Sequence, residues 1–502
     1  MSKKFYLTTA IPYVNALPHL GFALELVQAD AIARYHRFKG DNVFFLTGSD
    51  ENSLKNVRAA EKEGIETKEL VERNAKIFYG LKDVLNLSFN DFIRTTEERH
   101  IKGAQKLWLA CQKDIYKKNY AGLYCGECET FYLSKELENG LCPEHKIKPE
   151  YIEEENYFFA LSKYQKQLED LIKSDKLKII PETRKNEVLS FIKQGLDDFS
   201  ISRSKERAHN WGIPVPGDSS QIIYVWFDAL SNYINALGYA ENNEILHQFW
   251  QNNENILHII GKGIIKFHAI YWPAMLMSAG LNLPKTIFVH GYLTIDGVKI
   301  SKSFGSPLAP SEVVKKYGVD PVRYFLLREI PAVSDGDFSY QKFEERYQAD
   351  LANVLGNLVS RIVVMVQKYF DGALNLGRSD RKEIERIIAP YKLFDQLERD
   401  SYYFHTNLTK LWEIVNNLDK YLQENKPFEV VKTDKEKTEK ILATAALGLL
   451  AFSHRLLPFL PETAGKIFER FGLSTPKLFN QNDWQGQKVV IKDTSPLFPR
   501  LN

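Results

Sequence analysis

Hydrophobic residues in the first fifty positions follow a strand pattern, then a helix pattern and then a strand pattern again. Residues 4–9 form a short run of β-branched and aromatic side chains, which predicts a strand. Apolar residues then recur three and four apart from Leu20 to Ala31, which predicts an amphipathic helix that Gly40 ends. The apolar run 43–46 predicts a second, buried strand. Together they predict one βαβ unit, whose ligand lies at the carboxyl ends of the strands, beside the helix N-terminus.

The second half of the chain repeats this alternation. The pattern predicts strands at residues 221–226, 256–260 and 286–291, and helices at 228–237 and about 264–277. Alternating strands and helices indicate a parallel sheet, here built from two halves, with the substrate crevice where the halves meet. Residues from about 65 to 118, which follow the first unit, have a helical pattern.

The last third of the chain is helical in pattern from Gly318 onward, and a helix bundle is predicted to begin at residue 350. The longest uncharged apolar run, from Ile441 to Ser453, has thirteen residues. A membrane-spanning helix needs roughly 20, so this run is predicted to be a buried core helix.

Length and composition are those of a globular protein with several domains. The 502 residues suggest about three domains, and the 44% hydrophobic and 26% charged fractions are ordinary values. The net charge of +2 leaves only local patches for any contact with nucleic acid. The first strand follows the N-terminus directly, so no secretory signal is predicted, and four cysteines are too few for a disulfide scaffold. These features predict a cytoplasmic protein without membrane association.

Three of the four cysteines belong to a pattern of two knuckles. Cys125 and Cys128 are three apart, and Cys142 and His145 repeat this spacing after thirteen intervening residues. This is the spacing of a tetrahedral Cys3His zinc site. All four ligands come from the protein, so the metal has no open position and is expected to be structural. Cys111 lies outside the pattern and is expected to be a buried small hydrophobe.

Two further motifs carry a family resemblance. Pro-Tyr-Val-Asn at 12–15 is followed by His-Leu-Gly at 19–21, and Lys-Ile-Ser-Lys-Ser stands at 299–303. The glycine patterns of P-loops and dinucleotide folds are absent. In their order and separation, the two motifs resemble the two signatures of class I aminoacyl-tRNA synthetases. The zinc knuckle and a series of aromatic residues narrow the resemblance to the methionyl-tRNA synthetase family, and it covers essentially the whole chain.

The resemblance implies an α/β, doubly wound parallel-sheet (Rossmann-like) catalytic domain, split by a zinc-knuckle insertion and followed by an all-α anticodon-binding helix bundle. The implied ranges are 1–115 and 216–298 for the two halves of the catalytic domain, 116–215 for the connective insertion with its knuckle at about 120–148, 299–349 for a mobile-loop and stem-contact region, and 350–502 for the anticodon-binding domain. The implied activity is ATP-dependent activation of L-methionine and its transfer to the 3'-terminal adenosine of tRNA(Met). ATP with Mg2+ is the implied co-substrate, one structural Zn2+ the implied metal, and a monomer the expected state.

The implied chemistry is electrostatic. Attack of a carboxylate on the α-phosphate of ATP builds negative charge on phosphoryl oxygens and on the departing pyrophosphate, so the rate depends on placement and on positive groups. His19, Lys299 and Lys302 are the expected catalytic residues. The expected ATP-binding residues are Asn15, His19, Gly21, Gly261, His290, Gly291, Lys299, Ser301 and Lys302.

The resemblance also implies a methionine pocket. Its expected residues are Ile11, Tyr13, Asp50, Trp226, Ala229, Tyr233 and His268. Aromatic edges suit a flexible thioether, and a carboxylate at Asp50 can hold the α-ammonium group. Alone, each aromatic residue would be ordinary core, and Asp50 could instead cap the helix that starts near Ser53. The order of the whole series favours the pocket.

Three residues of the last third match the anticodon-reading positions of the family. Asn357 and Arg361 are four apart, so they share one face of a helix, and a planar guanidinium suits the reading of splayed bases. The alternative is that Asn357 and Arg361 are a surface pair bonded to each other. Phe428 stands where the family usually has a tryptophan, with less ring area for stacking. Anticodon affinity is therefore expected to depend more on Arg361.

Two other functions fit parts of the pattern. A class I synthetase for another aliphatic amino acid would keep the fold, but the aromatic series and the lack of a large editing insertion disfavour it. A catalytically inactive, synthetase-like tRNA-binding protein would have lost its chemistry through departures from the family pattern at Phe22, Asn52 and Gly263. That alternative is disfavoured by the intact His19, Asp50, Lys299 and Lys302.

Overall fold

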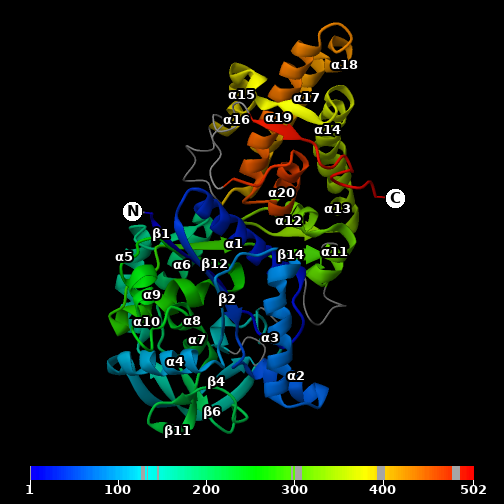
Figure 1. Cartoon of the computed structure of the whole chain (residues 1–502). Coiled ribbons are helices and arrows are strands. Elements are labelled where there is room, and N and C mark those ends of the chain that lie inside the picture. The colour runs from blue at the N-terminus through cyan, green and yellow to red at the C-terminus, as the bar shows by residue number, and fades with distance from the viewer. Residues whose placement is uncertain are drawn as a thin grey trace.

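The computed structural model describes residues 2–125, 130–132, 134–143, 146–295, 298–299, 308–392, 402–476 and 487–501. Figure 1 shows an elongated molecule with an α/β body at one end and a helical part, coloured yellow to red, at the other. The α/β body is built around one central sheet.

Six parallel strands form the central sheet. In sheet order they are β3 (Asp91–Arg94), β2 (Asn42–Ser49), β1 (Lys4–Thr9), β12 (Ile256–Gly261), β13 (Thr286–His290) and β7 (Lys178–Ile180). The chain order reverses between β1 and β12, which pair from Tyr6 with Ile256 to Thr9 with Ile259. Such a reversal opens a crevice at the carboxyl ends of the strands. The predicted doubly wound parallel sheet is confirmed.

Side chains of the sheet alternate between two apolar cores, with the period of two that a strand imposes. Leu7 of β1 points into a core shared with α1 (Leu20–Phe38) and with the helical part. Its neighbour Tyr6 points into a second core, which contains residues of α4 (Glu98–Ala110) and α10 (Trp272–Ala279). The sheet is therefore buried on both faces, as a parallel sheet requires.

The prediction that residues 221–226 form a strand of this sheet is wrong. Residues Asp218–Ile223 form β11, which pairs antiparallel with β9 (Ser202–Ser204) and β10 (Pro214–Val215) in a separate three-stranded sheet. The helix α7 (Val225–Leu230) then begins, so Trp226 is helical. Periodicity cannot separate a short apolar run in a strand from one that enters a helix. The sixth place in the sheet is taken by β7, from the range expected to be insertion.

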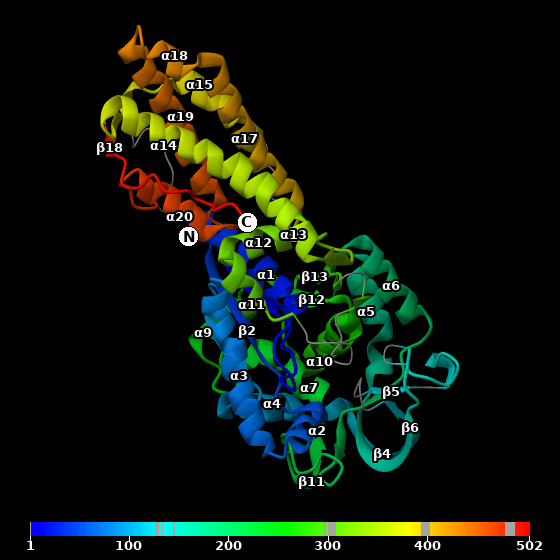
Figure 2. The ribbon, with the colours of Figure 1, turned by 90° about the vertical axis from the view of Figure 1, so that its right-hand side faces the viewer.

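The helical structure predicted for residues 65–118 is also wrong in two places. This range forms α3 (Thr67–Val84) and α4, but β3 lies between them, and β4 (Ile115–Cys125) begins at its end. β4 pairs antiparallel with β6 (Glu150–Phe159) along its length. Figure 2 shows this pair at the side of the body, with β5 (Thr130–Tyr132) next to it. Pairing with a distant strand overrides a local helical pattern.

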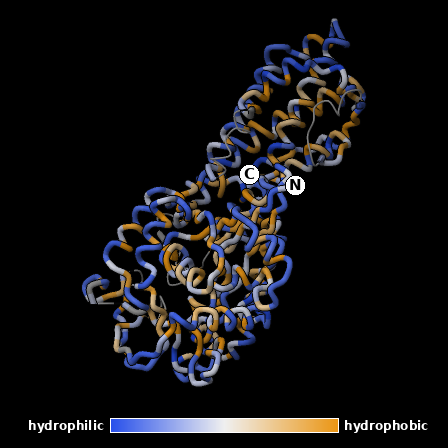
Figure 3. The backbone as a smooth tube through the Cα atoms, turned by 90° about the vertical axis from the view of Figure 1, so that its left-hand side faces the viewer, coloured by the Kyte–Doolittle hydropathy of each residue, from blue (hydrophilic) through white to orange (hydrophobic). Residues whose placement is uncertain are grey.

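The helical part is a bundle, as predicted, with one small sheet added to it. Its main helices are α14 (Asn357–Phe370), α17 (Phe404–Asn425), α18 (Pro427–Val430), α19 (Lys435–Leu456) and α20 (Pro461–Arg470), and β17 (Ala373–Asn375) pairs with β18 (Lys488–Val490). Orange and blue segments alternate along these helices in Figure 3. The apolar run from Ile441 to Ser453 is buried throughout, which confirms its prediction as a core helix.

One helix of this part is long and apolar enough to cross a membrane by length and composition alone. It spans Tyr340–Phe370, 31 residues in which α13 (Tyr340–Arg346) and a π-helical segment (Tyr347–Gly356) run into α14. Half of its most apolar window is buried inside the protein. The buried apolar side chains of this helix, such as Leu355, Ile362 and Val366, belong to the core of the bundle.

A buried ion pair joins the body to the helical part. Arg323 of α12 (Val319–Arg328) lies 2.8 Å from Asp30 of α1, and both side chains are fully buried. Arg323 also donates to the carbonyl oxygen of Phe459, in the turn after the bundle helix α19, over 2.8 Å. Burial alone would raise the pKa of Asp30, but Arg323 and Arg34 outweigh it and lower that pKa below its ordinary value. Removal of one partner from such a pair costs about 3–5 kcal/mol.

Candidate functional site

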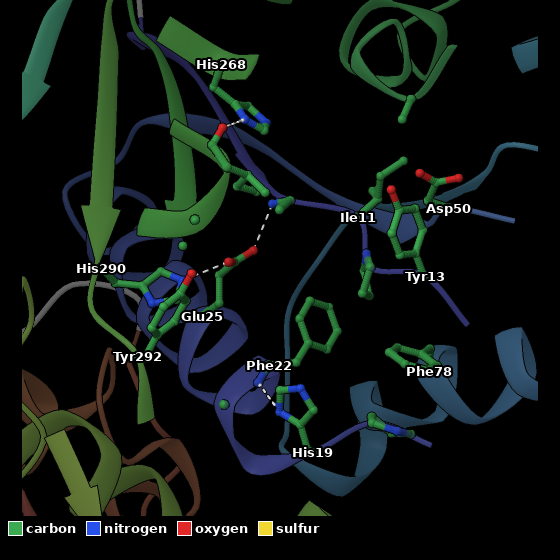
Figure 4. Close-up of a pocket in the computed structure, with 18 of the residues that line it drawn as sticks. Ile11, Tyr13, His19, Phe22, Glu25, Asp50, Phe78, His268, His290 and Tyr292 are labelled. Carbon is green, nitrogen blue, oxygen red and sulfur yellow. Dashed lines mark hydrogen bonds and ion pairs between the residues drawn. The ribbon is translucent and has the colours of Figure 1, made fainter. Parts of the chain in front are cut away.

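A cavity of about 390 Å³ lies at the carboxyl ends of the central strands. It is lined by the segments that follow β1, β12 and β13, by Asp50 after β2, and by the first turn of α1. The helices α7 and α8 (Asn232–Asn235) close another side. This is the crevice that the strand order predicts. Figure 4 shows its lining residues.

The structure brings most of the predicted site residues together around this cavity. Those that line it are Ile11, Tyr13, His19, Gly21, Asp50, Trp226, Ala229, Tyr233, Gly261, His268, His290 and Gly291. Asn15 does not line it. Lys299 ends the short strand β15 (Val298–Lys299), but its side chain, like all of Ser301 and Lys302, lies outside the described residues.

His19 caps the helix that starts at the cavity. It has an extended backbone, and its Nδ1 accepts a hydrogen bond from the backbone N–H of Phe22 over 3.3 Å. A neutral ring with an accepting Nδ1 carries its hydrogen on Nε2. Gly21 makes this possible, because a Cβ there would lie 3.0 Å from the His19 ring. The absence of a side chain at Gly21 therefore leaves room for the His19 ring against the backbone.

Asp50 is buried at the end of β2, and its main chain is fixed on both sides. Its N–H donates to Pro12 over 2.9 Å, and the side chain of Asn56 donates to its carbonyl oxygen over 3.1 Å. The alternative role of Asp50 as a helix cap is not what the structure shows. Ser53 caps α2 (Leu54–Glu63), because its hydroxyl accepts from the N–H of Lys55.

Two neutral histidines hold the aromatic side of the cavity. The Nε2 of His268 lies 2.7 Å from the hydroxyl of Tyr233, and its Nδ1 lies 3.0 Å from the carbonyl oxygen of Ile264. A carbonyl only accepts, so Nδ1 carries the hydrogen and Tyr233 donates to Nε2. Burial lowers the pKa of His268 to about 4, although the bond to Ile264 opposes that shift. His258, behind Tyr233, is also buried, and burial lowers its pKa well below the ordinary value.

Trp226 forms one wall by stacking. Its ring lies parallel to that of Phe267, with centroids 3.7 Å apart. Such pairs add about 0.5–1.5 kcal/mol beyond the burial of their area. The wall is therefore built by helix packing between α7 and the segment that follows β12, and the sequence alone assigned Trp226 to a strand.

Glu25 is a site residue that the sequence analysis missed. It is buried in α1, accepts a hydrogen bond from the N–H of Ala10 over 2.8 Å, and lies 2.8 Å from the Nε2 of His290. His290 also places its Nδ1 2.7 Å from the carbonyl oxygen of Gly291, so both of its ring nitrogens face acceptors. A signal was present, because Glu25 is the only charged residue between positions 20 and 29.

Phe22, Phe78 and Tyr292 also line the cavity and were not predicted to do so. Phe22 and Phe78 pack with ring centroids 5.6 Å apart, so the position that departs from the family pattern carries an apolar contact with α3. Gly263 is explained by Tyr292, because a Cβ at 263 would lie 2.1 Å from the Tyr292 hydroxyl. No local sequence pattern predicts contacts between segments this far apart in the chain.

The base of the Lys299 segment is tied to the rim of the cavity. β14 (Leu293–Ile295) pairs with β15 and with β16 (Gly336–Phe338). Asp335 accepts from the N–H of Tyr292 over 2.8 Å and pairs with Lys262 at 2.7 Å. Gly291 leaves room for this loop, because a Cβ there would lie 2.1 Å from the backbone of Ser334. The strand that ends at Lys299 therefore starts from a fixed support beside the cavity.

The other predicted residues lie away from this cavity. Asn357 and Arg361 are exposed on one face of α14, and Arg361 forms an ion pair with Asp419 of α17. Phe428 of α18 is 50% exposed. Of the four predicted zinc ligands, Cys125 and Cys142 are buried, whereas Cys128 and His145 lie outside the described residues. Within the described ranges, no three metal-binding side chains come together.

The sheet is doubly wound, and the cavity lies where the strand order reverses, with a helix-capping histidine in its lining. The sequence has no glycine-rich phosphate loop. These are the features of a class I synthetase. A family model described as tRNA synthetases class I (M) matches residues 5–148 and 132–363. The chain belongs to this methionyl family.

Comparison with individual proteins agrees over the whole length. Methionine--tRNA ligase of Brucella suis is 41% identical over 485 residues, which cover 95% of this chain and 93% of the relative. That of Thermotoga maritima is 42% identical and covers 99% of this chain and 80% of the relative. The solved Mycobacterium tuberculosis methionyl-tRNA synthetase in complex with methionyl-adenylate has a TM-score of 0.92, with 37% identity over 99% of this chain and 100% of that chain.

The hydrogen-bond pattern of His268 predicts its titration. In the folded protein its pKa is about 4, below the ordinary value of 6.5, so the folded state binds this proton less well than the unfolded state. The resulting contribution to stability is complete above about pH 6.5 and falls by about 3 kcal/mol as the pH drops through 4. NMR of histidine-labelled protein should show a midpoint below pH 5 with the hydrogen on Nδ1. The Tyr233→Phe variant should keep that tautomer, since Ile264 still accepts. A midpoint near 6.5, or a hydrogen on Nε2, would contradict the assignment.

Proposed function

We propose that the protein is a methionine--tRNA ligase, which activates L-methionine with ATP and transfers it to the 3'-terminal adenosine of tRNA(Met). The observation that carries this proposal is the full-length likeness to methionine--tRNA ligases, including a structure bound to methionyl-adenylate. The cavity at the switch point offers an aromatic side and a charged side, which suit the two halves of such an adenylate.

The amino acid is proposed to bind on the aromatic side. The carboxylate of Asp50, which lines the cavity with Ile11 and Tyr13, is proposed to hold the α-ammonium group. Trp226 and Tyr233 supply ring edges for the thioether, with Ala229 as a small residue between them. His268 is neutral, so this side of the pocket presents no cation to an apolar side chain.

ATP with Mg2+ is proposed to bind on the other side, near His19, Gly261, His290 and Gly291. The methionine carboxylate oxygen forms a bond to the α-phosphorus, the bond to the bridging oxygen breaks, and pyrophosphate leaves with that electron pair. A helix N-terminus favours negative charge, and His19 sits at this one with its Nε2–H as a donor. Lys299 and Lys302 are proposed to stabilise the departing charge.

The second step consumes the adenylate. A ribose hydroxyl of the terminal adenosine of tRNA attacks the carbonyl carbon and the ester bond forms. AMP leaves with the electrons of the broken C–O bond, and the hydroxyl proton passes to its phosphate. Placement of the two reactants supplies most of the acceleration in such transfers. We expect the protein to be a cytoplasmic monomer.

Amino-acid-dependent ATP–pyrophosphate exchange tests the proposed function. With a panel of amino acids, exchange should be fastest with methionine, by at least about tenfold over leucine and valine, because the aromatic pocket favours the thioether. Exchange with another aliphatic amino acid would instead support a different class I synthetase. Absence of exchange with every amino acid, in a protein that still binds tRNA, would support an inactive relative.

The anticodon is proposed to bind the tip of the bundle. Arg361→Ala should raise the KM for tRNA by about tenfold or more, because charge-assisted hydrogen bonds contribute about 1.5–3 kcal/mol. Phe428→Ala should raise it less, since the phenyl ring offers limited stacking area. Aminoacylation kinetics measure both, and pyrophosphate exchange should stay unchanged. Val364→Ala, exposed on the same helix, is the matched control. Equal losses for Arg361 and Phe428 would contradict the proposal.

A structural zinc ion is proposed for the lobe that contains β4 and β5. Cys125 and Cys142 are fully buried but belong to none of the three apolar cores formed by the described residues. The cysteines that the structure describes form no disulfide. Buried thiols without an apolar core around them suit a site whose metal takes the place of a core, with Cys128 and His145 as the other ligands.

Elemental analysis should find about one zinc per chain in protein purified without chelator. Cys142→Ser should lose most of it, because a closed four-ligand site cannot replace a missing thiolate. The variant should become more sensitive to proteolysis in this lobe while it keeps exchange activity, and Cys111→Ser is the matched control. Immediate loss of exchange after removal of zinc, measured with Mg2+ restored in excess and without any change in proteolysis, would indicate a catalytic zinc ion instead.

A further inference from the structure

Asp228 is a buried carboxylate on the helix that forms one wall of the cavity. It belongs to α7, between Trp226 and Ala229, which both line the cavity, and its side chain is 1% exposed. No role proposed above uses it. A carboxylate buried this deeply needs hydrogen-bond donors, and the donors identify the parts of the chain that it holds together.

Each oxygen of Asp228 has a donor from a different element. The amide Nδ2 of Asn52, after β2, lies 2.7 Å from Oδ2. The same Nδ2 lies 3.1 Å from the carbonyl oxygen of Thr95, so it faces two acceptors and its orientation is determined. The Nε2 of His100 in α4 lies 2.5 Å from Oδ1.

The orientation of His100 is also determined. Its Nε2 faces a carboxylate oxygen of Asp228, which only accepts, so Nε2 carries a hydrogen, and the carbonyl oxygen of His100 accepts from the amide of Asn235 over 3.2 Å. Asn235 of α8 also donates to the hydroxyl of Ser231 over 2.7 Å, and that hydroxyl donates to the carbonyl oxygen of Asp228 over 2.6 Å. The network therefore fixes α7 and α8, the two helices that carry Trp226 and Tyr233.

The other end of the network reaches the opposite wall. The N–H of Asn52 donates to a carboxylate oxygen of Asp50 over 3.3 Å. In Figure 4, Asp50 lies with Ile11 and Tyr13, and His268 lies on the other side of the view. Asn52 thus connects the carboxylate on one wall with the helices on the other.

We propose that Asn52 and Asp228 are positioning residues that set the separation between the two walls of the amino-acid pocket. This inference rests on the proposed function and deepens it. The pair should affect the binding of methionine far more than that of ATP, because the ATP side is built by α1 and by the ends of β12 and β13, which the network does not include.

Steady-state pyrophosphate exchange on Asn52→Ala, Asp228→Asn and the double variant tests this. Asn52→Ala removes a donor, and Asp228→Asn must turn its own N–H toward either Asn52 or His100. Loss of a hydrogen bond to a buried charge corresponds to about a tenfold change or more. Each single variant should therefore raise the KM for methionine about tenfold, with kcat and the KM for ATP within about twofold. The double variant should be no worse than the poorer single one, since both act on one contact.

Asn253→Ala is the matched control. Asn253 is a buried asparagine and donates to the carbonyl oxygen of Phe249 over 3.0 Å, but it precedes β12 at the far end of the sheet. It should lower the thermal midpoint without changing the KM for methionine. An unchanged KM for methionine in Asn52→Ala, or equal rises in both KM values, would overturn the proposal. If Asp228→Asn does not fold, Asn52→Ala decides by the same criterion. Wild-type protein without methionine-dependent exchange would show that the proposed function itself fails.

Discussion

The ion pair between Asp30 and Arg323 is the contact on which the arrangement of the whole molecule depends. Both groups are fully buried, so neither can exchange its partner for water without a large loss of stability. Arg323 also holds the carbonyl oxygen of Phe459, and Asp30 accepts from the N–H of Ser88 over 2.6 Å. One guanidinium therefore joins α1 and the loop before β3 to the turn after α19. Since α1 begins at His19, one rigid helix connects the cavity with the helical part.

The cavity is a consequence of strand order and needs no special loop. The reversal between β1 and β12 leaves the ends of four strands facing one space, and each following segment adds a different kind of group. The two apolar cores fix the strands from both faces. What remains adjustable is the position of the segments beyond the strands. Buried polar networks, such as that around Asp228, fix these segments because each donor and acceptor permits one arrangement.

The sequence was most informative where local signals agree with tertiary structure. The first βαβ unit could be predicted because its apolar spacing, its helix-ending Gly40 and its buried second strand all match the final packing. Most of the twelve predicted residues that line the cavity follow the ends of β1, β2, β12 and β13, whereas Trp226, Ala229 and Tyr233 reach it from α7 and α8. Trp226 was placed in a strand and Glu25 was missed, since both depend on contacts with distant segments. β7 was missed because three residues carry too little pattern.

Three histidines of the cavity show what a motif leaves undecided. His19 accepts at Nδ1, His268 donates from Nδ1 and accepts at Nε2, and His290 places both nitrogens against acceptors. The three histidines therefore differ in role: His19 caps a helix, His268 is a neutral part of the pocket wall, and His290 is the partner of Glu25. The groups that face each ring nitrogen determine these roles. These partners come from segments up to 265 positions away. The residue types of the site follow from its motifs, but their hydrogen-bonding states follow only from the way the sheet brings the segments together.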